Sequence, residues 1–273
     1  MLDRRTLLAS LAALPFLAHG AARSATAPLS ISRAGLIFLT VEVNGRSAKA
    51  LVDTGSVRGI QLAPALAGQL GLSTSQTGRT TQRYDGAHPI LSTRLATFAY
   101  ADTRAANVEA FVSPGDIENI SRQIGESFDA ILGWPLLGAR PFVIDYAARS
   151  FVNDGPLPRG GLVLPLEPNR PLPVTAGSLS GQPITFMVDT GAPHSNVDAS
   201  LAGGAAIGSR VELPFEIGGR AFTTSFRVRD LTPMTRGVGA RAVIGHRFLQ
   251  AYSFAWDPAA REIRLVQAAQ PTA

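Results

Sequence analysis

The sequence predicts a mainly β protein built from two similar lobes. Its 273 residues include 27 glycines and 19 prolines, and short runs of alternating apolar and polar residues outnumber stretches with helical periodicity. One pattern occurs twice, so the chain divides into halves of roughly 110 to 130 residues, within the usual size of a domain. We expect the first lobe over residues 30–158 and the second over residues 159–270.

The clearest repeated element is the tripeptide Asp-Thr-Gly, at residues 53–55 and again at residues 189–191. Each copy ends an apolar run, and each follows the glycine of a turn dipeptide by eight residues, Asn44-Gly45 in the first half and Ser180-Gly181 in the second. This spacing predicts that each acid closes the second strand of a hairpin. One such tripeptide alone would be weak evidence, because Asp-x-Gly turns are common, but two copies with repeated flanks indicate a duplicated unit.

Downstream, each half contains two apolar residues followed by glycine, at 131–133 and at 243–245, which are 112 residues apart. The Asp-Thr-Gly copies are 136 apart, so the second half is 24 residues shorter between its two motifs. The first half keeps a polar, glycine-containing stretch over residues 77–94. We expect a projecting hairpin there that the second half lacks.

In these features the chain resembles the two-lobed aspartic proteases. It is pepsin-like in having both lobes on one polypeptide and retropepsin-like in its compactness, and the likeness covers roughly residues 34–266. The resemblance implies two closed, barrel-like β lobes with short helices on either side of a central cleft. It also implies that Asp53 and Asp189 form a catalytic dyad that hydrolyses peptide bonds.

The chemistry of such a pair explains why two acids are needed. Two carboxyl groups that share one site do not both ionise readily, so the pair holds one proton over a wide acidic range. The ionised acid takes a proton from a water that attacks the amide carbonyl, and the protonated acid donates to the developing oxyanion. The reaction needs no metal or cofactor, and we expect none.

Five further residues are expected to support the geometry of the dyad: Thr54, Gly55, Ser56, Thr190 and Gly191. By resemblance, the threonine hydroxyls reach the backbone of the opposite lobe, and the glycines let backbone N–H groups approach the carboxylates closely. Only the first loop has a hydroxyl after its glycine, Ser56, where the second has Ala192. Because a hydrogen bond to the charged form lowers a pKa, we expect Asp53 to be the more acidic partner.

The resemblance also implies a flap over the cleft, formed by residues 77–94. Its tip residues are expected to contact the substrate: Tyr84, Asp85 and Gly86. Arg58, in the first loop, stands where many relatives have small hydroxyl residues, and its charge could change the activity and the pH optimum. A second function therefore stays open, a catalytically silent peptide-binding protein of the cell envelope that uses the same cleft.

Residues 1–27 are expected to be a secretory leader. Arg4 and Arg5 precede an apolar segment over residues 7–18 and then small residues, which is the layout of a signal peptide, and the arginine pair resembles a twin-arginine export signal. We expect a periplasmic or extracellular protein with no stable membrane span, because no run of eighteen apolar residues occurs.

Composition excludes several other classes of protein. The chain has no cysteine, so neither a disulfide framework nor a thiolate metal site is available. Its net charge of +5 comes from arginines that are scattered along the sequence, which does not favour nucleic-acid binding. None of the four histidines has the spacing of a metal site. The expected partner is a peptide or unfolded protein, and the expected state is a monomer.

Local patterns give two smaller predictions. Short helices are expected after each Asp-Thr-Gly loop, over residues 64–70 and 197–202, and after the glycines at 133 and 245. Asp145 and Asp257 repeat with an arginine four residues later, and we interpret them as turn residues between two strands, paired to those arginines and without a catalytic role.

Overall fold

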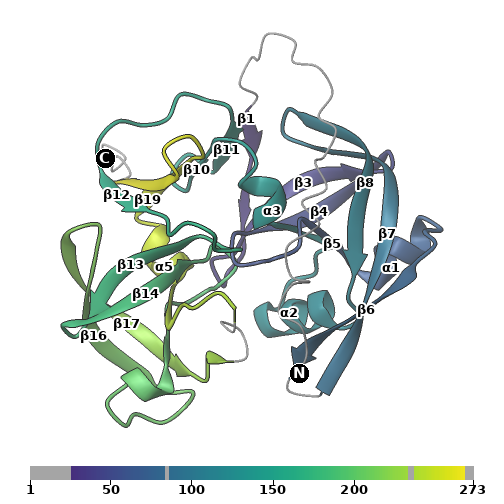
Figure 1. Cartoon of the computed structure of the whole chain (residues 1–273). Helices are drawn as coiled ribbons and strands as arrows, with labels where there is room; N and C mark the ends of the chain where they lie inside the picture. The colour runs from purple at the N-terminus through teal and green to yellow at the C-terminus, as the bar shows by residue number, and fades with distance from the viewer. Residues whose placement is uncertain (1–25, 84–85, 233–236, 268–273) are drawn as a thin grey trace.

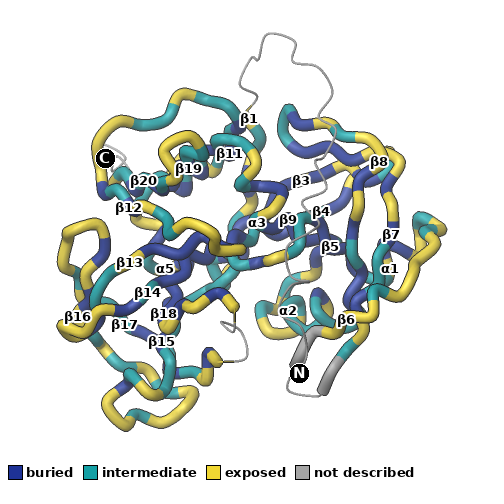
Figure 2. Tube along the Cα trace, in the orientation of Figure 1, coloured by how far each residue is buried: buried dark blue, intermediate teal, exposed yellow. Residues whose placement is uncertain are grey.

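The structure is a computed structural model, and it describes residues 26–83, 86–232 and 237–267. Two β barrels lie side by side, with the first-lobe strands in blue and the second-lobe strands in green (Figure 1). The buried stretches run along the strands of both barrels, while the exposed stretches lie mostly in the outer loops (Figure 2). The predicted mainly β fold with two lobes is confirmed.

The barrel of the first lobe has six strands and is closed by pairing between β3 and β7. In spatial order they are β3 (Ile37–Val43), β4 (Arg46–Asp53), β9 (Ala130–Gly133), β5 (Ile60–Leu62), β8 (Thr103–Val112) and β7 (Gly86–Tyr100). Two further strands, β2 (Ser30–Ile31) and β6 (Ser75–Arg83), extend this sheet at its edges.

The barrel of the second lobe repeats this arrangement without the edge strands. Its strands are β13 (Val174–Leu179), β14 (Gln182–Val188), β18 (Ala242–Ile244), β15 (Asn196–Asp198), β17 (Arg220–Arg229) and β16 (Arg210–Ile217). The duplication seen in the sequence is therefore a duplication of a six-stranded barrel.

The two predicted hairpins that precede the acids are present. The turn between β3 and β4 has Asn44 at φ 49° and Gly45 at φ 78°, and the turn between β13 and β14 has Ser180 at φ 49° and Gly181 at φ 80°. Two consecutive residues with positive φ are what a tight hairpin turn requires, and asparagine and glycine tolerate it well.

A third sheet, which the sequence did not predict, joins the two lobes. It contains three strands from each half, in the order β1 (Thr26–Pro28), β11 (Ser150–Asn153), β10 (Phe142–Asp145), β19 (Tyr252–Asp257), β20 (Glu262–Gln267) and β12 (Leu162–Pro165). The halves meet where β10 pairs with β19, and Phe142 stacks on Phe254 across that boundary with ring centroids 5.7 Å apart. This sheet fixes one lobe against the other.

The helices are short, as expected, with one addition. The predicted helices appear as α1 (Pro64–Gln69), α3 (Trp134–Leu137), α5 (His246–Leu249) and a single 3₁₀ turn, η1 (Ala199–Leu201). The last is shorter than predicted because residues 196–198 belong to β15. Helix α2 (Asp116–Ile124) was not predicted, although its apolar residues Ile117, Ile120 and Ile124 lie on one face and pack in the core.

The turn aspartates behave partly as expected. Asp145 accepts a hydrogen bond from the N–H of Ala148, and Asp257 accepts from the N–H groups of Ala259 and Ala260. Among the described residues neither forms an ion pair with an arginine, so the predicted arginine pairing is wrong. The turn backbone itself supplies the donors.

The extra hairpin of the first half is formed by β6 and the first part of β7, with Arg83 opposite Gly86 and a register shift between Gln76 and Thr80. Tyr84 and Asp85, the predicted flap tip, lie outside the described residues. In the part of the chain that the structure covers, no helix is long and apolar enough to cross a membrane.

Candidate active site

The two Asp-Thr-Gly loops begin where two matching strands end. Strand β4 ends at Asp53, beside Gly133 of the parallel strand β9. Strand β14 ends at Val188, and the N–H of Asp189 then donates to the carbonyl of Ile244 in the parallel strand β18, at 2.9 Å. Parallel pairing with a second strand thus fixes the start of each loop.

Four hydrogen bonds between the threonines hold the two loops together. The Thr54 hydroxyl donates to the Val188 carbonyl at 2.8 Å, and the Thr190 hydroxyl donates to the Val52 carbonyl at 2.7 Å. Each hydroxyl also accepts from the N–H of the other threonine, at 3.1 Å and 3.0 Å. Both threonines are fully buried, so these bonds are shielded from water and each satisfies a buried backbone group.

The same contacts bring the two carboxyl groups together. The Asp53 and Asp189 carboxyl groups lie close enough for each to change the pKa of the other through charge and hydrogen bonding. A Cβ atom on Gly55 would overlap the carboxyl group of Asp189, and a Cβ atom on Gly191 would overlap that of Asp53. Neither glycine has a positive φ, so their role is close approach to the opposite acid and not an unusual backbone conformation.

Burial raises the pKa of both acids. The rise takes Asp53 well above its ordinary range, because the charge of Asp189 and the hydrogen bond to it add to the effect of burial. The pKa of Asp189 is also raised by burial, but several hydrogen bonds act in the opposite direction. The pair therefore behaves as two coupled acids that share a proton.

The backbone decides which acid carries the charge. The N–H groups of Gly55 and Ser56 face Asp53, whereas those of Gly191, Ala192 and Gly55 face Asp189. The shortest of these bonds join each glycine to the acid of its own loop, at 2.9 Å in the first loop and 2.8 Å in the second. The larger number of donors around Asp189 favours the negative charge on that acid.

The expectation that Asp53 is the more acidic partner depended on a hydrogen bond from the Ser56 hydroxyl. The Ser56 hydroxyl accepts from the side-chain amide of Gln61 at 2.9 Å and lies 3.3 Å from the carbonyl oxygen of Arg58. It makes no hydrogen bond to Asp53 among the described residues. Ser56 therefore stabilises the loop behind the acid and does not donate to the acid, so the lower pKa expected for Asp53 loses this support and stays a prediction.

Gly133 and Gly245, which follow two apolar residues in each half, let the Asp-Thr-Gly loops pass close behind the acids. A Cβ atom on Gly133 would overlap the carbonyl oxygen of Arg58, and one on Gly245 would overlap the carbonyl oxygen of His194. The N–H of the residue after each glycine also donates to the loop, at 3.0 Å in the first lobe and 2.7 Å in the second. Any larger residue here would push an acid-bearing loop out of place.

Two buried polar side chains near Asp189 were missed by sequence reasoning. The Tyr146 hydroxyl and His246 Nδ1 are buried without a hydrogen-bond partner among the described residues, and their rings meet edge to face at 5.2 Å. Burial raises the pKa of Tyr146, with a smaller contribution from the charge of Asp189, and burial lowers the pKa of His246 to about 4. Both groups are therefore neutral at physiological pH. The sequence held one weak signal. Corresponding positions of the two halves are 112 residues apart, and the position that corresponds to Tyr146 is Pro258, so the tyrosine occurs in one half only.

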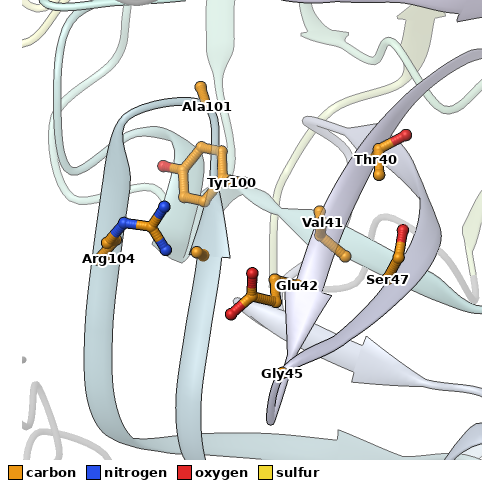
Figure 3. Close-up of a pocket in the computed structure, with 9 residues that line it drawn as sticks. Thr40, Val41, Glu42, Gly45, Ser47, Tyr100, Ala101 and Arg104 are labelled. Carbon is orange, nitrogen blue, oxygen red and sulfur yellow. The ribbon is translucent and has the colours of Figure 1, made fainter.

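A groove of about 280 Å³ lies elsewhere on the first lobe, between the β3–β4 hairpin and the β7–β8 hairpin (Figure 3). Glu42 and Arg104 point toward it from β3 and β8, with Tyr100 between them. None of its lining residues belongs to an Asp-Thr-Gly loop, so this groove is separate from the paired acids.

Comparison with known proteins agrees with this geometry. A family model described as aspartyl protease matches residues 39–136, which run from β3 through the first Asp-Thr-Gly loop to α3. A search of curated proteins finds no match to this sequence. The family match covers the first lobe only, and the two six-stranded barrels are consistent with a two-lobed aspartic protease.

Proposed function

We propose that this protein is an exported endopeptidase in which Asp53 and Asp189 activate a water that attacks a peptide bond. The observation that supports this most directly is the pair of neighbouring carboxyl groups, one from each lobe, each packed on the glycine of the opposite loop and held by the reciprocal threonine contacts. A relative of aspartic proteases that had lost catalysis would have no need to keep two neighbouring acids with raised pKa values, since holding them together costs folding free energy.

In this mechanism Asp189 is the base and Asp53 the acid. Asp189, with more backbone donors, carries the negative charge and takes a proton from the attacking water. Asp53 keeps its proton and donates it to the carbonyl oxygen as the tetrahedral intermediate forms. Proton transfer to the departing nitrogen then completes hydrolysis. The glycine N–H groups hold the carboxyls in place, so little reorganisation is needed.

The substrate is proposed to be an extended peptide that lies between the lobes and pairs with strand edges through its main chain. The β6–β7 hairpin is the candidate flap, and Gly86 begins the strand that returns from its tip. Tyr84 and Asp85 keep their predicted role as substrate contacts. Both acids come from a single chain, so a monomer is sufficient to build the site.

The test is to replace each acid in turn by asparagine and measure cleavage of an unfolded polypeptide between pH 3 and pH 7. Each variant is expected to lose roughly 100- to 10,000-fold in kcat, which is what general acid–base catalysis by a positioned group contributes. Asp145→Asn is the matched control, since its carboxyl serves only a turn, and it should retain full activity. Absence of cleavage by the wild type, with peptide binding retained, would instead support the silent peptide-binding role.

Export is proposed to involve removal of a leader upstream of Thr26. Strand β1 begins at Thr26 and pairs with β11 in the sheet that joins the lobes, so cleavage after Ala27 would remove two of its three residues. We therefore expect the mature protein to begin before Thr26. N-terminal sequencing of the secreted protein tests this, and a mature terminus at Pro28 would contradict it.

A further inference from the structure

The second Asp-Thr-Gly loop is flanked by arginines that have no partner of opposite charge. His194 follows Asp189 by five residues, as Arg58 follows Asp53, and both carbonyls pack on the matching glycines Gly245 and Gly133. His194 and Arg58 thus occupy equivalent places on the two sides of the paired acids. Their surroundings differ in charge.

Strand pairing brings two arginines beside the loop. Arg227 of β17 lies opposite Asn196 of β15, two residues after His194, and its N–H donates to the carbonyl of Ser195 at 2.9 Å. On its other side, Arg227 lies directly opposite Arg210 of β16. Two like charges at directly opposite positions destabilise a sheet unless something neutralises them.

Two more arginines complete the group. Arg229 lies two residues beyond Arg227, on the same face of β17, and Arg247 is in α5, two residues after the glycine that packs on His194. After burial, the charges of these four arginines are what lower the pKa of His194, so all four lie within electrostatic range of one ring. We call Arg210, Arg227, Arg229 and Arg247 the arginine cluster.

The charge of this cluster is not compensated by the protein. Over the described ranges none of the four arginines forms an ion pair, and the buried Nε of Arg227 has no hydrogen-bond partner. The carboxylate of Asp198, which lies opposite Arg229, accepts instead from the N–H groups of Ser200 and Leu231. A buried guanidinium nitrogen without an acceptor costs free energy that a bound carboxylate would recover.

We propose that the arginine cluster is an anion subsite that selects substrates carrying an acidic side chain a few residues from the scissile bond. This rests on the proposed peptidase function. Guanidinium groups match the two oxygens of a carboxylate with parallel hydrogen bonds. An extended peptide advances about 3.3 Å per residue, so a chain bound across the acids can present a side chain to the flank of the second loop.

The selectivity is expected on one side of the scissile bond only. At the equivalent place in the first lobe, the Arg58 guanidinium donates to the side-chain oxygen Oε1 of Gln61 at 2.8 Å and lies 3.8 Å from the carboxylate of Asp116. Its charge is therefore already balanced within the first lobe. The two halves of the cleft would then select different substrate side chains, although the catalytic acids of the two lobes are equivalent.

The experiment uses matched peptides that differ only by glutamate or glutamine at one position, scanned over four residues on each side of the cleaved bond. The wild type is expected to prefer glutamate by roughly tenfold in kcat/KM at one or two positions on a single side, the size of a charge-assisted hydrogen bond. Arg227→Gln, and separately the exposed Arg210→Gln, should reduce that preference to about twofold or less. Arg220→Gln, at the other end of β17 over the ring of Phe222, is the matched control and should keep it.

Each outcome bears on the inference separately from the peptidase function. Cleavage of both peptides of every pair at equal rates by the wild type would overturn the subsite while leaving the peptidase intact. If no peptide is cleaved, the peptidase proposal fails, and the subsite is tested by fluorescence anisotropy with the same peptides. About tenfold tighter binding of the glutamate peptide, lost in both cluster variants, supports it. Equal binding, or tighter binding of a single-stranded oligonucleotide than of the glutamate peptide, overturns it.

Discussion

The two Asp-Thr-Gly loops share their backbone contacts and differ in what surrounds them. The threonine hydrogen bonds, the glycine-to-acid contacts and the packing on a glycine of a neighbouring strand recur in both lobes with nearly the same distances. Around the first loop, the charge of Arg58 is balanced by Asp116, and its guanidinium also donates to Gln61. Around the second loop, four arginines are left unbalanced. Duplication thus preserved the contacts that position the acids, while the flanks were free to differ.

The environment of the acids themselves also differs. Asp189 faces more backbone N–H donors than Asp53 and lies near the buried hydroxyl of Tyr146. The corresponding position of the second half is Pro258, so no matching hydroxyl lies near Asp53 by symmetry. Two equivalent carboxyls can therefore take different roles, one as acid and one as base, because their neighbours are not equivalent.

The largest expected effect comes from adding a methyl group to either loop glycine. Gly55→Ala and Gly191→Ala each place a carbon where the opposite carboxyl lies, so the acids must separate. We expect activity to fall more than about 100-fold in both variants, since a displacement near 1 Å can cost that much, with a stability loss of roughly 1 to 3 kcal/mol from overpacking. Cleavage assays and thermal denaturation measure the two effects.

Gly68→Ala is the control for that comparison. Gly68 lies in α1 with open space around it, and alanine there should stabilise the protein by about 0.5 to 1 kcal/mol. A large difference between Gly55→Ala and Gly191→Ala would show that the loops are less equivalent than their contacts indicate.

The next effect concerns the threonines. Thr54→Val and Thr190→Val keep the side-chain volume but leave one carbonyl and one N–H unsatisfied in the buried centre. We expect each to lower the free energy of unfolding by about 2 to 4 kcal/mol, because each unsatisfied buried group costs about 1 to 3 kcal/mol. Chemical denaturation measures it, and the exposed Thr223→Val should change stability by less than about 0.5 kcal/mol. Unequal losses of stability in Thr54→Val and Thr190→Val would show that the two threonines do not contribute equally.

Much of this fold could be predicted from sequence because its signals are local. The turns at Asn44-Gly45 and Ser180-Gly181 need positive φ, and their spacing to the acids fixed both hairpins. The sheet that joins the lobes could not be predicted in the same way. Its strands have three to six residues, whereas a long barrel strand such as β8 has ten, and β10 pairs with β19, more than 100 residues away.

In the site, too, some features could be predicted from local sequence and others depend on tertiary packing. The acids, threonines and glycines were predicted from a repeated motif, whereas the partner of the Ser56 hydroxyl depends on where Gln61 is placed by β5. The arginines appear scattered in sequence because they come from β16, β17 and α5. They gather only when the second barrel closes. Contacts made by tertiary packing, and the charges it collects, were therefore the part that sequence did not reveal.

A smaller expected effect concerns how the contribution of each acid to stability depends on pH. The pKa of Asp53 is raised in the folded state, so the folded protein binds that proton more tightly than the unfolded chain. Its contribution to stability is complete below the unfolded pKa of about 3.9 and is lost as the pH rises through the folded pKa. Asp53→Asn should therefore be more stable than wild type at pH 7, by on the order of 1 kcal/mol, and should show no such gain at pH 3.

Asp189→Asn is the comparison for this prediction. More N–H donors favour the anion of Asp189, so its replacement should stabilise the protein less at pH 7. Melting temperatures across pH 3 to 7 measure both variants, with Asp145→Asn as a turn control. A larger gain in Asp189→Asn would reverse the assignment of acid and base.

The smallest expected effect comes from a substitution that leaves an arginine beside the first loop without a balancing charge, as around the second loop. Asp116→Asn removes the carboxylate 3.8 Å from Arg58, and both side chains are 18% exposed, so stability should change by less than about 1 kcal/mol. The freed charge of Arg58 should raise the preference for glutamate over glutamine about twofold on the side of the scissile bond that faces the first lobe. Glu118→Gln is the matched control, because it removes another acid from the first turn of α2 without changing the surroundings of Arg58. An unchanged preference in Asp116→Asn would mean that Arg58 does not act on the substrate, and one-sided selectivity would then depend on the arginine cluster alone.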